Sequence, residues 1–431
     1  MKQKQTNLLA IFDSHTPYLA FRLNALHREI EARGLSDRLH LEIVLIGAEE
    51  KSYGWEGEGL QSFYDAKLHV LSDQFRGLGM RSFLHRSVPG CLWRLFKRLI
   101  RLRPKVTFVG GYDRPESILT TLLTRLWGGK TGVWNDSKFN DAESYGKSIW
   151  IELIKSLMVA RYAFYLCPGH DSVEYHRFLG GRKKLALSDS WDVVDNEGIG
   201  KAAGDNAHDS EIRETLGLKE EARFFFMPVR FIAKKNVNRV LTAYAAYHKR
   251  QGEASLPLVI CGKGPLEDAI RRQVDDLQIG AHVNLVPWLA YERVPRACRL
   301  SQALILASTH DQWGMIVNEA LAAGAPVLVS NRCGAHEVVR NHINGFTFDP
   351  YDVEHISALL AIMTQDQPLI DRLRENAAAS VESFSIDQWL GNHFAVLEHY
   401  GILVPAPNDQ SSTSTTDPVA GSNTPDRQPA P

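Results

Sequence analysis

The chain has 431 residues, of which 44% are hydrophobic, and its formal net charge at pH 7 is -1. This length exceeds what a single compact core usually serves and predicts two domains, and the balanced charge excludes the excess of basic residues that recruits nucleic acid. The five cysteines stand singly, without metal-like spacing, as is typical of reduced thiols in the cytoplasm.

In the first half of the chain, short apolar runs alternate with longer segments of helical period. The runs predict strands at residues 7–12, 41–47, 105–111, 131–136 and 163–169. Such alternation is typical of a parallel sheet covered by helices. We assign residues 1–200 to this first Rossmann-like domain.

A polar stretch around residues 198–220 precedes a second series of the same kind. Strands are predicted at residues 222–230, 257–264, 282–288, 303–308 and 325–330, and we assign residues 201–384 to a second Rossmann-like domain. Residues 386–400 predict a last amphipathic helix, and we place about 385–403 back on the first domain. Residues 404–431, rich in Pro, Ser and Thr, predict a disordered tail. The predicted fold class is α/β, with two doubly wound domains.

Candidate binding residues of the second domain follow its predicted strands, because ligands of open α/β sheets bind beyond the carboxyl ends of the strands. Arg230 and Lys235 lie in the loop after the first of these strands, where two cations before a helix suit a diphosphate. A solvated basic loop is the alternative. Gly262 and Gly264 end the next strand, where missing side chains allow a backbone to approach a ligand.

Asp311, Gly314 and Glu319 follow the strand predicted at 303–308, and Glu319 lies in the first turns of the next helix. Acids at a helix start also complement the helix dipole, which is the alternative to a binding role. The dipole does not explain why these acids share a topological position with the cations of the other loop. We therefore predict that the acids and the cations face one crevice.

Several of these segments resemble the nucleotide-sugar half of retaining glycosyltransferases of family 4, the glycosyltransferase group 1 proteins. The motifs are RFIAKKN, VICGKGPLED and the run from DQWGMIVNEALAAGAP to NHINGFTFDP, and the resemblance covers about residues 222–390. The first half is similar to a branch of that family through HTPYLAFRLNALHREI, VGGYDRPE, VWNDSKFND, PGHDSVEYHRFLG and DVVDN. The resemblance implies the GT-B fold, with two domains facing each other across a cleft. It also implies transfer of a sugar with retention from a nucleoside-diphosphate sugar, without a metal or other cofactor, to a glycan, lipid-linked or small-molecule acceptor.

The resemblance implies roles for single residues. It places Arg230 and Lys235 on the diphosphate, Asp311 on the hydroxyls of the donor sugar and Glu319 on the ribose. It assigns further donor contacts to Gly262, Gly264 and the amides of Gly314, Met315 and Ile316. Asp136 is the candidate polar group near the reacting sugar, with a plain helix cap as the alternative. His15, Tyr18, Tyr112 and Asp113 follow strands of the first domain and are candidates for acceptor contact, with purely structural roles as the alternative.

Three features depart from the family pattern. Asp311 stands where glutamate is usual and is shorter, Val229 stands where glycine is frequent, and the first strand ends in DSHTPY instead of a glycine-rich loop. A weakly active or inactive nucleotide-sugar-binding protein is therefore an alternative function. A sugar-nucleotide epimerase is less favoured, because the spacing of carboxylates and histidine does not suit it.

Residues 90–105 interleave apolar and basic side chains and predict an amphipathic helix. The helix could lie on an anionic membrane, or pack its apolar face on the sheet. The first apolar run of the chain ends at Asp13, too short for a signal peptide, and no stretch reaches a membrane span. We expect a cytoplasmic protein, with peripheral contact at the inner face of the membrane left open.

Overall fold

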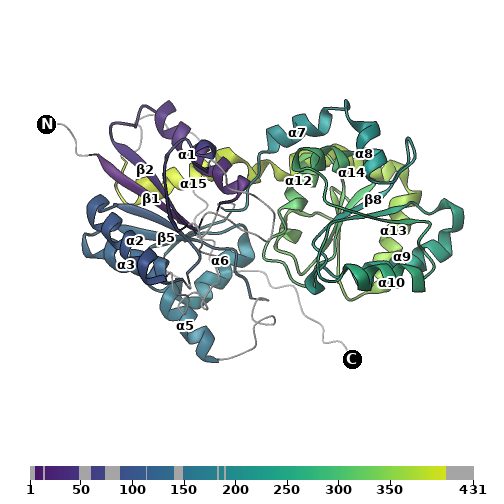
Figure 1. Ribbon diagram of the computed structural model, residues 1–431, viewed down its shortest axis with the longest axis horizontal. Coiled ribbons are helices and arrows are strands. Elements are labelled where there is room, and N and C mark those ends of the chain that lie inside the picture. The colour runs from purple at the N-terminus through teal and green to yellow at the C-terminus, as the bar shows by residue number, and fades with distance from the viewer. Residues whose placement is uncertain are drawn as a thin grey trace, which may run out of the picture.

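The structure is a computed structural model that describes residues 5–12, 15–47, 60–72, 88–112, 114–139, 149–181, 184–188 and 191–403. Within these ranges the strands form two parallel sheets, which lie in separate halves of the ribbon (Figure 1). The predicted α/β class with two doubly wound units is confirmed. The tail expected at 404–431 lies outside the described residues.

The first sheet has the order β3-β2-β1-β4-β5-β6-β7 over the described part of the chain, and its neighbouring strands are parallel. Its strands are β1 (Thr6–Phe12), β2 (Leu39–Gly47), β3 (Lys67–Ser72), β4 (Val106–Gly110), β5 (Lys130–Trp134), β6 (Phe164–Leu166) and β7 (Leu185–Leu187). The accompanying helices are α1 (Pro17–Ala32), α2 (Val88–Leu102), α3 (Pro115–Leu126), α5 (Ile149–Val159) and α6 (His170–His176), with single turns η1 (Leu60–Phe63) and η3 (Arg177–Gly181).

The second sheet, again over the described residues, has the order β10-β9-β8-β11-β12-β13 with parallel neighbours. Its strands are β8 (Phe225–Pro228), β9 (Leu258–Cys261), β10 (Val283–Val286), β11 (Ala303–Leu306), β12 (Val327–Ser330) and β13 (Gly345–Phe348). Its helices are α7 (Asn196–Gly204), α8 (Asp209–Thr215), α9 (Val237–Gln251), α10 (Glu267–Asp276), α11 (Val294–Leu300), α12 (Ile316–Ala322), α13 (Val353–Gln365) and α14 (Gln367–Ala377). Shorter turns are η4 (Ala233–Lys235), η5 (Gly252–Ala254), η6 (Tyr291–Arg293), η7 (Gly334–Val338) and η8 (Ala378–Phe384).

The polar stretch expected to separate the domains is helical. Helices α7 and α8 occupy most of it, and α7 packs on α11 and α12 of the second sheet. Each helix buries only a few apolar side chains, Ile199 and Ala203 from α7 and Ile212 from α8, which explains why the stretch reads as polar. The amphipathic pattern is carried by too few residues to stand out in the sequence.

The last described helix, α15 (Ile386–His399), returns to the first sheet and lies beside α1 (Figure 1). Trp389 from this helix is completely buried in the same core cluster as Phe12 and Trp134. The indole of Trp134 donates to His393 Nε2 at 2.9 Å. The core of the first unit is therefore built from both ends of the described chain.

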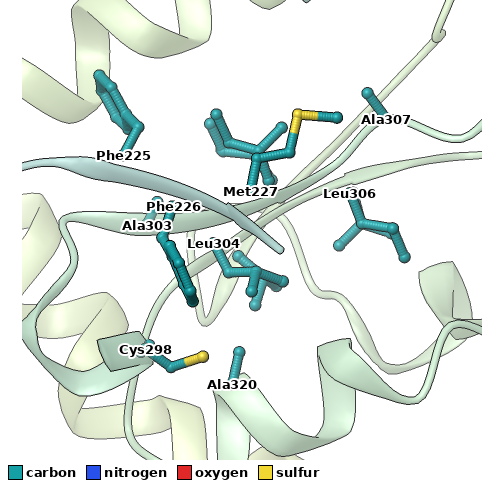
Figure 2. Packing of buried hydrophobic residues seen from close by; sticks show 14 of the residues in the cluster. Phe225, Phe226, Met227, Cys298, Ala303, Leu304, Leu306, Ala307 and Ala320 are labelled. Atoms are coloured by element: carbon teal, nitrogen blue, oxygen red, sulfur yellow. The ribbon is translucent and has the colours of Figure 1, made fainter. Parts of the chain in front are cut away.

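The strands of the second sheet are apolar on both faces, as expected of a parallel sheet covered by helices. Figure 2 shows Phe225, Phe226 and Met227 of β8 packed beside Leu304 and Leu306 of β11. All of these side chains are buried. This core fixes the ends of β8 and β11, from which the candidate site residues emerge.

Candidate functional site

Most of the candidate residues lie at the topological switch points, where the strand order of each sheet reverses. The reversal falls between β1 and β4 in the first sheet and between β8 and β11 in the second. His15 and Tyr18 follow β1, and Tyr112 follows β4, whereas residues 229–236 follow β8 and residues 307–315 follow β11. Ligands of doubly wound sheets bind at such points.

Hydrogen bonds hold the carboxyl ends of the two sheets against each other. Lys138 Nζ, after β5, donates to the Arg332 carbonyl, after β12, at 2.9 Å. The Glu337 carboxylate in η7 accepts from the backbone amides of His170 and Asp171, at the start of α6, at 2.6 and 2.9 Å. The carboxyl ends of the two sheets therefore face each other.

The loop after β8 is hydrogen-bonded to the loop after β11. The side-chain amide of Asn236, whose backbone is left-handed with φ of 59°, donates to the Ala307 carbonyl at 3.1 Å. This anchor brings the Lys235 ammonium onto the Asp311 carboxylate as an ion pair. The structure thus joins a cation and an acid that the sequence places 76 residues apart.

The Asp311 carboxylate is buried and has further partners. Ser308 Oγ donates to Oδ2 at 3.2 Å, and Lys234 Nζ lies 3.4 Å from Oδ1. Burial alone would raise the pKa of Asp311, but the charges of Lys235 and Lys234 outweigh burial and lower the pKa to about 2. Asp311 is therefore ionised at neutral pH and can accept hydrogen bonds.

Glu319 lies in α12, and its carboxylate accepts hydrogen bonds from hydroxyl groups of both units. Tyr18 Oη, on α1, donates to Glu319 Oε1 at 2.7 Å, and Tyr291 Oη, at the start of η6, donates to the same oxygen at 3.1 Å. Burial raises the pKa of Glu319 to about 7, although both hydroxyl groups lower it in part. The carboxylate already binds two hydroxyl groups, the chemistry expected of a ribose ligand.

The turn before α12 requires glycine. Gly314 has φ of +105°, and a Cβ at this position would lie 2.6 Å from Leu306 Cδ2. Met315 and Ile316, which open the helix, are half-buried. Their amides remain predicted donor contacts.

Gly262 and Gly264 allow two loops of the second unit to pack closely. A Cβ at Gly262 would lie 2.0 Å from the Val229 carbonyl oxygen, and one at Gly264 would lie 2.6 Å from that of Phe231. Val229 packs in the core, so its side-chain bulk is absorbed there. A direct contact of the glycines with a donor stays a prediction.

Arg230 and Asp136 occupy loops at the carboxyl ends of β8 and β5, and both are half-buried. The negative charge of Asp136 acts on the buried carboxylate of Asp192, a residue that the sequence analysis did not identify. Burial raises the pKa of Asp192 to about 7, the Arg22 guanidinium 3.6 Å away opposes this, and the charges of Asp136 and Asp311 add to it. Asp136 and Asp311 are therefore close enough to Asp192 for their charges to raise its pKa.

On the first unit, His15 and Tyr112 are buried. His15 Nδ1 lies 2.9 Å from Tyr64 Oη, and Tyr112 Oη lies 3.5 Å from Ser137 Oγ. Tyr18 contacts the second unit, as described above. Asp113 lies outside the described residues, and acceptor contact stays a prediction for all four candidates.

Other residues of the site were not found from the sequence, among them Lys234, Tyr291, Arg22 and Asp192. Lys234 could have been suspected as the neighbour of Lys235 in RFIAKKN. The others lie in helices or between elements, where no strand end marks them. Within the ranges that the structure describes, no group of three or more His, Cys, Asp or Glu side chains could hold a metal ion.

Comparison with known proteins bears on both halves. Residues 208–380 match the family described as Glycosyl transferases group 1. Alpha-D-kanosaminyltransferase of Streptomyces kanamyceticus is 22% identical over 178 residues, 41% of this chain and 45% of that protein. Alpha-monoglucosyldiacylglycerol synthase of Streptococcus pneumoniae is 25% identical over 192 residues, 43% of each. The chain thus spans less than half the length of these curated relatives.

Among solved structures, Anabaena Alr3699/HepE in complex with UDP and glucose has a TM-score of 0.70 at 14% identity. The match covers 92% of this chain and 100% of that one. At this identity the similarity shows a shared fold, and it extends over both sheets.

Proposed function

We propose that this chain, whose residues 208–380 match the glycosyltransferase group 1 family, transfers a sugar, with retention, from a nucleoside-diphosphate sugar to an acceptor hydroxyl without a metal ion. The observation that carries the proposal is the ion pair of Lys235 and Asp311 in the loops after β8 and β11, with Glu319 in the helix α12 that follows the second of these loops. The cation suits a diphosphate and the acids suit sugar hydroxyls.

In this proposal the donor runs from Glu319, on the ribose, past Arg230 and Lys235, on the diphosphate, to Asp311, on the transferred sugar. Lys235 exchanges its bond with Asp311 for one with a phosphate oxygen. Its charge then stabilises the leaving diphosphate as the glycosidic bond breaks, where electrostatic help accelerates the reaction. Asp311 becomes available to the sugar hydroxyls at the same moment.

In this proposal the acceptor binds on the side of the site that the first unit forms. We propose residues 1–200, with 385–403, as the acceptor domain and 201–384 as the donor domain. Asp136 is the proposed polar group near the reacting sugar, and a glycan, lipid-linked or small-molecule hydroxyl is the acceptor. The first-unit candidates His15, Tyr18 and Tyr112 are the proposed acceptor contacts.

The test is incubation of the protein with a panel of nucleotide sugars and acceptors, with and without a chelator. A transferred sugar of retained configuration, formed equally in the chelator, supports the proposal. Nucleotide binding without turnover would favour an inactive binding protein. Conversion of the donor without any acceptor would favour an epimerase.

Glu319→Ala is expected to weaken binding of the free nucleoside diphosphate by about 1.5 to 3 kcal/mol, the value of a hydrogen bond to a charged group. Because burial raises the pKa of Glu319 to about 7, the wild-type affinity should also rise as the pH passes from about 6 to about 8 and the carboxylate ionises. Calorimetric titration over this range measures both effects. Glu354→Ala, an exposed glutamate on α13, is the matched control. Equal affinities of Glu319→Ala and wild type would remove Glu319 from the ribose.

Peripheral membrane contact through α2 bears on whether the acceptor is lipid-linked. The helix buries Cys91, Leu95 and Leu99 on the sheet, so most of its apolar face is used in packing. Trp93, 57% exposed, remains outside, and α3, which packs on α2, adds Leu126 at 80%. No helix of the described residues is long and apolar enough to cross a membrane.

We propose that this face touches anionic lipid. Lys97 Nζ lies 5.0 Å from the centre of the Trp93 ring, and Leu126 follows Arg125 in α3, a composition that suits an anionic surface. One curated relative is named as a diacylglycerol glycoside synthase.

Trp93→Ser with Leu126→Ser is expected to reduce binding to phosphatidylglycerol vesicles at least about fivefold, because two exposed apolar side chains are lost. Binding to phosphatidylcholine vesicles should be weak for both proteins. Ile343→Ser, which alters an exposed residue of the second unit, controls for general surface change. Unchanged sedimentation of the double variant with anionic vesicles would contradict the assignment.

A further inference from the structure

Tyr18 is a residue of the first unit that packs on the second. It lies at the second position of α1, which Thr16 caps by accepting from the Leu19 amide at 3.0 Å. Its ring packs against the core cluster of the second sheet and meets the ring of Tyr291 edge-on, with centroids 5.8 Å apart. Packing of the ring against this core and against Tyr291 therefore holds the Tyr18 hydroxyl in place to donate to Glu319.

The same helix makes a second contact across the units. Arg22 lies one turn after Tyr18 on the same face of α1. Its guanidinium lies 3.8 Å from Met315 Sδ and donates to the Val193 carbonyl at 3.0 Å. Tyr18 thus belongs to a helix that is held against the start of α12.

Two hydroxyl groups on one oxygen of a buried carboxylate are what the vicinal hydroxyls of a ribose would provide. An ionised carboxylate in this place needs such donors, because an unpaired buried charge is costly. A ribose whose two vicinal hydroxyls reach both carboxylate oxygens would use Oε1 as well as Oε2, and Oε1 is the oxygen to which Tyr18 donates. Because the phenol and the ribose use the same acceptor, they compete.

We propose that Tyr18 sets the nucleotide affinity of this protein by competing with the ribose for Glu319. The proposal rests on the proposed function of Glu319. It implies that the nucleotide enters when α1 withdraws from α12, and that the first unit takes part in donor selection. A nucleotide that lacks a ribose hydroxyl forms fewer hydrogen bonds with Glu319 when it displaces Tyr18. The competition therefore favours ribonucleotides.

Tyr18→Phe removes the competing hydroxyl and keeps the ring. We expect uridine, guanosine or adenosine diphosphate, whichever the wild type binds, to bind the variant about tenfold more tightly, since one hydrogen bond to a charged group is lost by the free protein only. The titrations are made at about pH 9, because loss of this bond also raises the pKa of Glu319. Tyr400→Phe, which loses a hydroxyl bonded to the Ala163 carbonyl within the first unit, should leave the affinity unchanged.

A second comparison separates competition from a general loosening of the site. In a Glu319→Gln background, where the acceptor is neutral, Tyr18→Phe should tighten binding less than it does with Glu319 present. With Glu319 present, the gain from Tyr18→Phe should be smaller for the 2′-deoxy diphosphate than for the ribose form. Equal or weaker binding of Tyr18→Phe, with wild type binding normally, overturns the competition and leaves the proposed function standing. If neither protein binds any nucleotide, the proposed function fails and the competition with it. Binding gained by Tyr18→Phe alone would support the competition.

Discussion

Lys235→Ala is expected to slow sugar transfer by about two to three decades while the nucleoside without phosphates binds as before. The lysine is the proposed charge on the leaving diphosphate, and its side chain is mostly buried, so solvent screens its charge little. Its partner Asp311 also loses the closest of two cations. Rates with the identified donor, and titration of nucleoside against nucleoside diphosphate, measure the two effects.

The same substitution should lower the free energy of unfolding by about 3 kcal/mol, the cost of removing one partner of a buried ion pair. Because the pKa of Asp311 is lowered to about 2, the pair stabilises fully above the unfolded-state pKa of about 4 and this stability is lost as the pH falls toward 2. In the Lys235→Ala variant, the free energy of unfolding should therefore fall less steeply as the pH drops from about 4 toward 2.

Controls separate the chemical role of Lys235 from its structural one. Adding Asp311→Asn to Lys235→Ala removes the buried carboxylate that would otherwise keep only Lys234 as a partner, and it should restore much of the stability, but not the rate. Lys234→Ala, whose side chain is more exposed and lies farther from the carboxylate, should have the smaller effect on both. A Lys235→Ala enzyme that transfers sugar at the wild-type rate would remove this residue from the diphosphate.

Asp311→Asn is expected to slow transfer by about one to two decades, since about 1.5 to 3 kcal/mol of charge-assisted hydrogen bonding to the donor sugar is lost. Nucleotide affinity should be nearly unchanged, because the ribose contact lies at Glu319. The variant keeps the shape of the side chain and tests its charge.

Asp311→Glu tests the shorter acid that departs from the family pattern. The Asp311 backbone pairs with Cys333, and its carbonyl accepts from the Gly334 amide at 3.1 Å. A loop held in this way, with the carboxylate already between Ser308 and two lysines, should have no room for another methylene. We expect Asp311→Glu to be slower than wild type. A faster enzyme would show that the aspartate stops short of the sugar.

The fold could be predicted from the sequence wherever a strand is buried on both faces. The ten expected strands, from β1 to β12, are all present, with ends that differ by a few residues. The strands that were missed, β3, β7 and β13, lie at edges of the sheets within the described residues. Edge strands bury less surface, so their apolar residues are fewer or the run is short, as in KLHVLS and LAL.

The site could be predicted where it follows a strand end and not where it depends on how the two units meet. Lys235 and Asp311 come from neighbouring strands of one sheet, so the topology brings them together. Tyr18 and Glu319 are 301 residues apart and belong to different sheets, and no local pattern specifies that approach. Asp192 is hidden for a related reason, because its partner Arg22 lies far earlier in the chain, in α1, and no local pattern marks that pair.

The return of α15 to the first sheet bears on the order in which the molecule can be made. Domains usually fold in the order of synthesis, the amino-terminal one first. Here the core of the first unit lacks Trp389 and Phe394 until the ribosome has passed residue 394, after the whole second sheet has emerged. The core of the first unit therefore stays incomplete, with Trp134 uncovered, until α15 has been synthesised. A nascent chain stopped short of α15 offers an apolar surface to chaperones.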